Sequence, residues 1–217
     1  WQIIKQEKKH VIISEIEHPA VSKVLKEIEI YGIEVSTISV NDQAVVKIEE
    51  LIDLIKDETT LVSVMMANNE IGAIQPIKKI KQILKKYEIP LHTDAVQALG
   101  KIKVDVKELD VDYLSLSAHK FYGPKGIGAL YVKNKDDLGS LIIGGNQESG
   151  VRGGTENISG IIGMGLAAEL VTKNQDRWIK NLKKLERYFL EKVEHHLPHA
   201  IHHKTDNLPG LISISFP

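Results

Sequence analysis

The groups best suited to chemistry in this chain follow an apolar run of strand length, Tyr113 to Leu116. Ser117, His119 and Lys120 come directly after the run, and a loop with three glycines comes next. Burial at a strand end and a neighbouring cation both disfavour an ammonium ion. We therefore expect Lys120 to be poorly solvated and to favour the free amine, which attacks carbonyl groups. A plain turn between two strands is the alternative, and this stretch alone leaves both open.

Polar side chains also follow the other strand-like runs. In an open α/β sheet the ligand lies beyond the carboxyl ends of the strands. The residues at these positions are His18, Asn69, Asp94, Gln97, Ser117, His119 and Lys120. Each alone is compatible with a helix cap or a turn. Together they supply an amine, a carboxylate, amides and imidazoles, which is the set that holds pyridoxal phosphate (PLP): a lysine for covalent attachment and an aspartate for the pyridinium nitrogen.

The elements that would position these residues alternate between strand and helix patterns. Strands are expected at residues 10–14, 33–40, 61–66, 91–94, 113–116 and 127–132, and helices at residues 19–31, 48–55, 77–87 and 166–197. This alternation is typical of βαβ units, so we expect an α/β fold with a mainly parallel sheet sandwiched by helices. No G-x-G-x-x-G motif follows the first strand, which disfavours a nicotinamide dinucleotide.

A second, smaller unit is expected at the C-terminal end. The long helical pattern is followed by a histidine-rich polar tail, a turn and a strand-like run at 211–216. We expect residues 1–173 to form a large cofactor-binding domain, incomplete at its N-terminus, and residues 174–217 to begin a small α+β domain. The chain starts without methionine and stops directly after a strand pattern, so we expect it to be an internal piece of a longer protein.

Composition excludes several classes of function. The 217 residues carry a formal net charge of −1 and no cysteine, which gives no reason to expect nucleic-acid binding and rules out disulfides, thiolate metal sites and a cysteine nucleophile in this chain. No apolar run is long enough to span a bilayer, and no signal peptide is present. The expected location is the cytoplasm, although an organelle-targeting segment could precede the chain.

Five segments, in this order and at these separations, match a known family. They are IEHPAV around His18, NNEIG at 68–72, HTDAVQALGK at 92–101, SLSAHKFYGPKGIGALYV at 115–132 and SGVRGGTEN at 149–157. With them the chain resembles the PLP-dependent cysteine desulfurases of the NifS/IscS type, within the class V aminotransferase group. The resemblance covers essentially the whole chain and implies a PLP-dependent transferase of fold type I.

The resemblance implies catalytic roles for two residues and a cofactor-binding role for a third. Lys120 would bind PLP covalently and later move protons. His18 would stack on the ring face and assist proton transfer. Asp94 would pair with the pyridine N–H and keep the ring cationic, so that the ring accepts electrons from the substrate.

The remaining contacts to the cofactor are also implied by the resemblance. Gln97 and Asn69 would contact the side of the phenolic oxygen. Ser117 and His119 would bind the phosphate. Thr155, in RGGTEN, resembles the threonine that reaches the phosphate of the neighbouring subunit, so a homodimer with shared sites is implied.

The implied reaction converts L-cysteine to L-alanine and passes the sulfur as a persulfide to an acceptor protein, for iron–sulfur cluster or thiolated-cofactor synthesis. In the family the attacking cysteine and the arginine that binds the substrate carboxylate belong after the last residue of this chain. A further phosphate loop belongs before the first. We therefore expect the full-length protein to be a desulfurase and this piece alone to be incapable of turnover.

Three other interpretations are weighed against this one. Selenocysteine lyase, kynureninase or a small-molecule aminotransferase would need the same lysine, aspartate and histidine, but NNEIG combined with RGGTEN favours the desulfurase branch. A non-catalytic scaffold would explain the missing cysteine, whereas the intact lysine, aspartate and glutamine argue against it. A metal site in the tail would use His195, His196, His199, His202 and His203. These straddle a proline in a polar stretch without a carboxylate set, so a solvated loop is favoured and no metal is expected.

Overall fold

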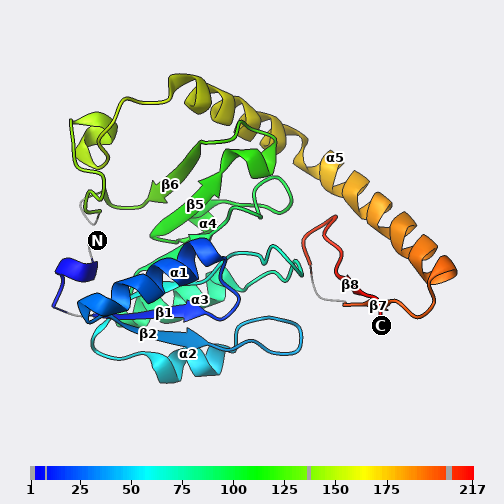
Figure 1. The fold of residues 1–217 in the computed structure, drawn as a ribbon, viewed down its shortest axis with the longest axis horizontal. Coiled ribbons are helices and arrows are strands. Elements are labelled where there is room, and N and C mark those ends of the chain that lie inside the picture. The colour runs from blue at the N-terminus through cyan, green and yellow to red at the C-terminus, as the bar shows by residue number, and fades with distance from the viewer. Residues whose placement is uncertain (1–2, 8, 136–137, 204–206) are drawn as a thin grey trace.

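The computed structural model describes residues 3–7, 9–135, 138–203 and 207–217. Its centre is a six-stranded sheet in the order β2-β1-β3-β4-β5-β6. The strands are β1 (His10–Ser14), β2 (Glu34–Ile38), β3 (Thr59–Ser63), β4 (Leu91–Asp94), β5 (Tyr113–Ser117) and β6 (Gly128–Val132). Neighbours from β2 to β5 pair in parallel, and β6 pairs antiparallel with β5 (Figure 1). The expected α/β fold with a mainly parallel sheet is confirmed.

Helices connect the parallel strands. The α-helices are α1 (Pro19–Ile28), α2 (Ile48–Leu54), α3 (Ile77–Leu84), α4 (Val106–Leu109) and α5 (Ile158–His196). Short 3-10 turns are η1 (Ile3–Lys5), η2 (Glu29–Tyr31), η3 (Lys85–Tyr87), η4 (Ala118–Phe121) and η6 (Gln147–Gly150). A two-stranded antiparallel ladder, β7 (Ile201–His202) with β8 (Ile214–Ser215), follows α5.

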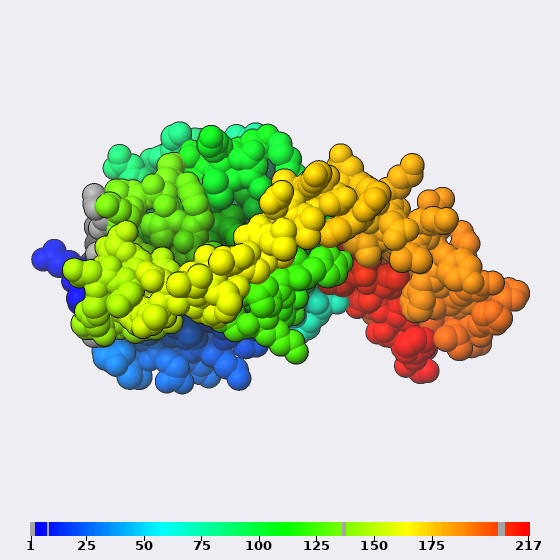
Figure 2. Space-filling model, turned by 90° about the horizontal axis from the view of Figure 1, so that it is seen from above, coloured from blue at the N-terminus to red at the C-terminus, as the bar shows by residue number. Residues whose placement is uncertain are grey.

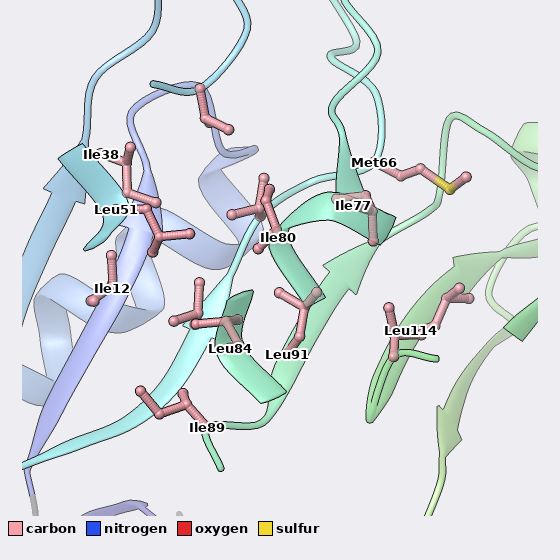
Figure 3. Packing of buried hydrophobic residues seen from close by; sticks show 14 of the residues in the cluster. Ile12, Ile38, Leu51, Met66, Ile77, Ile80, Leu84, Ile89, Leu91 and Leu114 are labelled. Carbon is pink, nitrogen blue, oxygen red and sulfur yellow. The ribbon is translucent and has the colours of Figure 1, made fainter. Parts of the chain in front are cut away.

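The core lies on both faces of the sheet. On one face Ile12, Leu91 and Leu114 pack against α2 and α3, through residues that include Leu51 and Ile80 (Figure 3). On the other face Val11 and Ile13 pack against Leu25 of α1. All five residues of β1 are buried, as expected for a parallel strand whose successive side chains point to opposite covered faces.

Several element boundaries differ from the prediction for local reasons. Helix α5 begins at Ile158 and not at residue 166, because the Asn157 side chain accepts a hydrogen bond from the Gly160 N–H and caps the helix inside the glycine-rich stretch. Helix α4 was not predicted; its four residues are too few for a helical period, and Asp105 caps it. The last expected strand, residues 211–216, is reduced to β8.

Helix α5 connects the sheet to the C-terminal segment. Its first half packs on η4, where Ala167 and Val171 contact a cluster containing Phe121. Its second half holds the tail, because the Gly210 N–H donates to a Glu186 carboxylate oxygen at 3.0 Å. Figure 2 shows α5 crossing the molecule and extending beyond the sheet, with the C-terminal segment against its far half. The helix runs through residues 173 and 174 without a break, and the division into two domains there stays a prediction.

Among the described residues, no helix is both long enough and apolar enough to cross a membrane.

Candidate active site

Lys120 lies in η4, directly after β5. Ala118 and Phe121 anchor this turn because both are buried, with 0% and 1% of their surfaces exposed. His119 and Lys120, between the two anchors, are exposed. The expectation that Lys120 is poorly solvated is therefore wrong for this chain: the turn buries its apolar residues and presents its basic ones.

Ser117 and His119 form a pair beside the lysine. The Ser117 hydroxyl and His119 Nδ1 are 2.9 Å apart and share a hydrogen bond. In a neutral pair of this kind the mutual hydrogen bond uses one of the two protons, and the other remains to be donated to a phosphate oxygen. The structure thus brings these predicted phosphate ligands next to Lys120.

Asp94 ends the neighbouring strand, β4, which is in register with β5 at Ser115. Only 8% of its surface is exposed, and Oδ1 accepts a hydrogen bond from the Val96 N–H at 2.8 Å. The carboxylate is therefore fixed at the same edge of the sheet as η4. Its bond to the Val96 N–H caps the following turn, and this local role is compatible with binding a ligand through the other oxygen.

Gln97 follows Asp94 and is bound to a second lysine. Lys101 Nζ donates to Gln97 Oε1 at 2.8 Å. Burial, and then the charge of Lys120, lower the pKa of the Lys101 ammonium. Lys101 is therefore a second amine close enough to Lys120 to be affected by its charge, and the bond that Lys101 makes leaves the Gln97 amide N–H groups to donate towards a ligand oxygen.

His18 is the N-cap of helix α1, at the end of the turn that follows β1. Its Nδ1 accepts a hydrogen bond from the Ala20 N–H at 3.1 Å, and the side chain is exposed. In the neutral ring this bond places the proton on Nε2, which is the nitrogen free to face a ligand. His18 can therefore cap the helix through Nδ1 and still offer Nε2 to a ligand.

Asn69 lies half-buried in the loop after β3. Its neighbour Asn68, which the sequence analysis did not single out, builds that loop. Asn68 Oδ1 accepts from the N–H groups of Glu70 and Ile71, and Nδ2 donates to the Ile16 carbonyl at 3.1 Å. This last bond ties the loop that carries Asn69 to the turn that carries His18.

Thr155 is the predicted site residue that does not follow the carboxyl end of one of the parallel strands. It is exposed in the segment between β6 and α5. Because β6 runs antiparallel to β5, this segment starts at the opposite edge of the sheet, as Figure 1 shows. The other seven residues follow the carboxyl ends of the adjacent strands β1, β3, β4 and β5.

Glu17 is a site-edge residue that the sequence analysis missed. It is 8% exposed, and its Oε1 accepts hydrogen bonds from the Ser14 hydroxyl at 2.5 Å and the Met65 N–H at 2.6 Å. Burial raises the pKa of the carboxyl to about 7, the two hydrogen bonds oppose this, and the charge of Asp94 adds to it. The signal in the sequence was an acidic residue between a strand and a helix-starting proline.

The raised pKa of Glu17 predicts a loss of stability on going from acid to neutral pH. The folded pKa of about 7 exceeds the unfolded value of 4.5, so the folded state holds the extra proton between these values. This stability is present below pH 4.5 and lost as pH rises through 7, by about 3 kcal/mol at most. We expect Glu17→Gln to lack this decrease when urea unfolding is measured at pH 5 and pH 8. An identical pH slope in both proteins would contradict the assignment.

Gly123 closes the turn after Lys120. A Cβ added there would lie 2.9 Å from Ala118 Cβ and 3.0 Å from the Ala118 carbonyl oxygen. We expect Gly123→Ala to displace this turn and to lower the free energy of unfolding by about 1–3 kcal/mol. Gly165→Ala is the matched control, since nothing lies within 4 Å of its Cβ and alanine favours the helix. Thermal unfolding checks both, and equal melting temperatures would contradict the prediction.

Two other features do not contribute to this site. A hollow of ≈ 1380 Å³ lies at the opposite edge of the sheet, against Thr59, Pro90 and Asp112 at the amino ends of the strands. In the tail, His203 Nε2 is 2.7 Å from the Ser215 hydroxyl. Within the described ranges, no three His, Asp or Glu side chains gather as a metal site would need.

The residues at the carboxyl edge fit PLP by their chemistry. Lys120 offers an exposed amine, Asp94 a fixed carboxylate for a ring nitrogen, and Gln97 amide N–H groups for a ring oxygen. Ser117 with His119 offers a donor for a phosphate. The buried Glu17 Oε2, which has no hydrogen-bond partner among the described residues, shows that this edge still holds an unsatisfied polar group.

Comparisons with known proteins agree with this chemistry. The Aminotransferase class-V model matches residues 1–217. The cysteine desulfurase IscS of Dictyoglomus turgidum is 45% identical over 210 residues, 96% of this chain and 53% of that protein. The mitochondrial cysteine desulfurase of Saccharomyces cerevisiae is 42% identical over 215 residues, 98% of this chain and 43% of that protein.

Solved structures show the same relationship. A NifS-like protein superposes with a TM-score of 0.94 at 39% identity, covering 99% of this chain and 59% of that one. The structure of SspA in complex with cysteine gives a TM-score of 0.73 at 41% identity, covering 76% and 48%. The chain thus spans about half the length of the curated relatives it matches. Class-V aminotransferases and cysteine desulfurases depend on PLP, and with this match the chain belongs to the class-V aminotransferase family.

Proposed function

We propose that the full-length protein is a cysteine desulfurase. It converts L-cysteine to L-alanine and passes the sulfur to a thiol as a persulfide, which serves an acceptor protein in iron–sulfur cluster or thiolated-cofactor synthesis. The observation that carries the proposal is the position of Lys120 and Asp94 at the carboxyl ends of the adjacent strands β5 and β4. The identity of 42–45% to cysteine desulfurases supports the choice of substrate within the family.

Lys120 holds the cofactor through its amine and moves a proton at the Cα atom of the substrate. When bound, PLP supplies the electron sink that weakens the bonds at Cα. Asp94 keeps the ring nitrogen protonated. His18 would face the ring of the cofactor and would exchange a proton through Nε2, since Nδ1 accepts the bond from the Ala20 N–H.

The other predicted ligands complete the cofactor site. Gln97 and Asn69 would hold the phenolic oxygen of PLP. Ser117 and His119 would bind its phosphate, and their mutual hydrogen bond holds the two side chains together.

Sulfur transfer needs a thiol that this chain does not contain. The carbon–sulfur bond of cysteine breaks, the sulfur binds the attacking thiolate, and the carbon skeleton leaves as alanine. With no cysteine in 217 residues, the thiolate comes from outside this sequence. The balance is one cysteine and one thiol giving one alanine and one persulfide.

We further infer a cytoplasmic homodimer, with residues 1–173 as the cofactor domain and 174–217 as the start of the small domain. Thr155 would contact the phosphate in the neighbouring subunit. Its exposed side chain supports this, because it is available to a neighbouring subunit. The exposed isoleucines Ile158, Ile161 and Ile162, which begin α5 beside it, are suited to a subunit contact.

The test is turnover by the full-length protein loaded with PLP. With L-cysteine and a reductant, we expect alanine and sulfide in equal amounts. Alanine formed only from L-selenocysteine would identify a selenocysteine lyase and overturn the proposal. Bound cofactor without product from either amino acid would instead identify a scaffold that retains the fold.

A further inference from the structure

Glu17 is a buried carboxyl group that the proposed chemistry does not use. It lies directly before His18, and 8% of its surface is exposed. Oε1 receives hydrogen bonds from the Ser14 hydroxyl of β1 and from the Met65 N–H beyond the end of β3. One oxygen atom therefore joins the turn before His18 to the segment that follows β3, at a residue 48 positions later in the sequence.

The surroundings of the second oxygen of Glu17 favour the protonated form of the carboxyl group. Oε2 is buried and has no hydrogen-bond partner among the described residues. A buried carboxylate with one bare oxygen carries a large desolvation cost, whereas the neutral acid keeps both bonds to Oε1 at a smaller cost. Asp94, at the end of β4, is the charged group that acts on Glu17, and its negative charge also disfavours ionisation.

We propose that Glu17 is a positioning residue that acts as a neutral carboxylic acid, fixing the His18 turn against β3 and leaving Asp94 as the ionised carboxylate for the cofactor ring. The role towards His18 rests on the proposed function, but the state of Glu17 itself does not. The raised pKa of about 7 is in line with this geometry. Loss of the proton would place a second negative charge near Asp94 and strain the turn, so the arrangement couples the site to pH near neutrality.

The first experiment measures the proton directly, in the full-length apoprotein. Infrared difference spectra between the wild type and Glu17→Gln are recorded from pH 5 to pH 8.5. We expect the stretching band of a protonated carboxyl at pH 5 to 6, lost by pH 8.5. Glu15→Gln is the matched control, because Glu15 lies in the same turn and is exposed; its difference spectrum shows which bands come from replacing an exposed carboxyl in this turn. A carboxylate band for Glu17 at pH 6 would overturn the proposal.

The second experiment tests the role towards His18 in the holoprotein. Glu17→Gln keeps a neutral acceptor for the Ser14 hydroxyl and the Met65 N–H, so we expect kcat within about twofold of the wild type at pH 6.5. Glu17→Ala removes the acceptor, and we expect kcat to fall about tenfold with KM little changed, because a displaced group loses efficiency without losing substrate affinity. A loss in Glu17→Gln equal to that in Glu17→Ala would show that the charge is needed and would overturn the proposal.

A double-mutant cycle separates positioning from general damage. His18→Asn keeps a side-chain acceptor for the helix cap but removes the imidazole. If Glu17 acts through His18, Glu17→Ala has no further effect in the His18→Asn background. Additive losses would overturn the positioning role. Should Glu17→Ala fail to fold, Glu17→Gln and the infrared titration still decide the question. If the wild type has no turnover with cysteine, the proposed function fails while the titration of Glu17 still reports its proton.

Discussion

Replacing Lys120 by alanine is expected to lower turnover of the full-length protein by at least about 10³-fold, because it removes both the covalent attachment of PLP and a positioned proton carrier. The exposed amine at the end of β5 is the group that reaches a carbonyl at this edge of the sheet. Cofactor should bind the variant only noncovalently. An absorption spectrum with added PLP, borohydride reduction and peptide mapping check the attachment, and steady-state kinetics check the rate.

Two other lysines serve as comparisons for that experiment. Lys125→Ala removes an exposed lysine five residues away in the following loop and should leave adduct and rate unchanged. Lys101 is the competing amine, because burial and the charge of Lys120 lower its pKa. A reduced adduct on the peptide that contains Lys101 would reassign the nucleophile. Equal adducts in the parent and in Lys120→Ala would mean nonspecific labelling and would contradict the assignment.

The sheet and three of its four helical connections could be predicted from the sequence because their signals are local. The β4 strand, Leu91–Asp94, is found at the predicted residues, and Pro19 opens α1 as its fixed φ angle predicts. Strands in alternation with helices leave few topologies other than a parallel sheet, so the edge at which the polar residues gather follows from the pattern alone. Placement of His18, Asp94 and Lys120 at one edge was therefore predictable.

Burial at the site was not predictable, because it depends on partners distant in the sequence. Glu17 looks like a surface residue of a turn until the Met65 N–H, 48 residues later, is placed against it. Lys120 looks buried because it follows an apolar strand, but Ala118 and Phe121 take the inward positions of η4. Period and composition do not fix which side of a single-turn helix faces the core.

The separate roles of Asn68 and Asn69 have the same origin. Both residues stand in the same loop motif, and their types are identical. Only the hydrogen bonds of Asn68 to the Glu70 N–H and to the Ile16 carbonyl show that it holds the loop, which leaves Asn69 as the residue available to a ligand. A motif match identifies the loop. Which of its residues stabilises the loop, and which is available to a ligand, depends on hydrogen bonds to the backbone that the motif does not give.

Replacing Asp94 by asparagine is expected to lower kcat by about 10²–10³-fold, the size of effect seen when one fixed electrostatic partner of a reacting group is removed. Asparagine keeps an oxygen that accepts from the Val96 N–H, so the turn after β4 is preserved and only the charge is lost. Without that charge the ring nitrogen loses its proton and accepts electrons poorly. Steady-state kinetics with L-cysteine, together with circular dichroism to confirm folding, measure the effect, and unchanged kcat would contradict the role of Asp94.

The same variant has a second expected result, at Glu17. The charge of Asp94 contributes to the raised pKa of Glu17, so Asp94→Asn should lower the pH at which the protonated carboxyl band disappears. The two carboxyls then behave as a pair in which one is kept neutral by burial and by its charged neighbour. If the titration of Glu17 does not move in Asp94→Asn, burial alone sets its protonation, and the two groups act independently at this edge of the sheet.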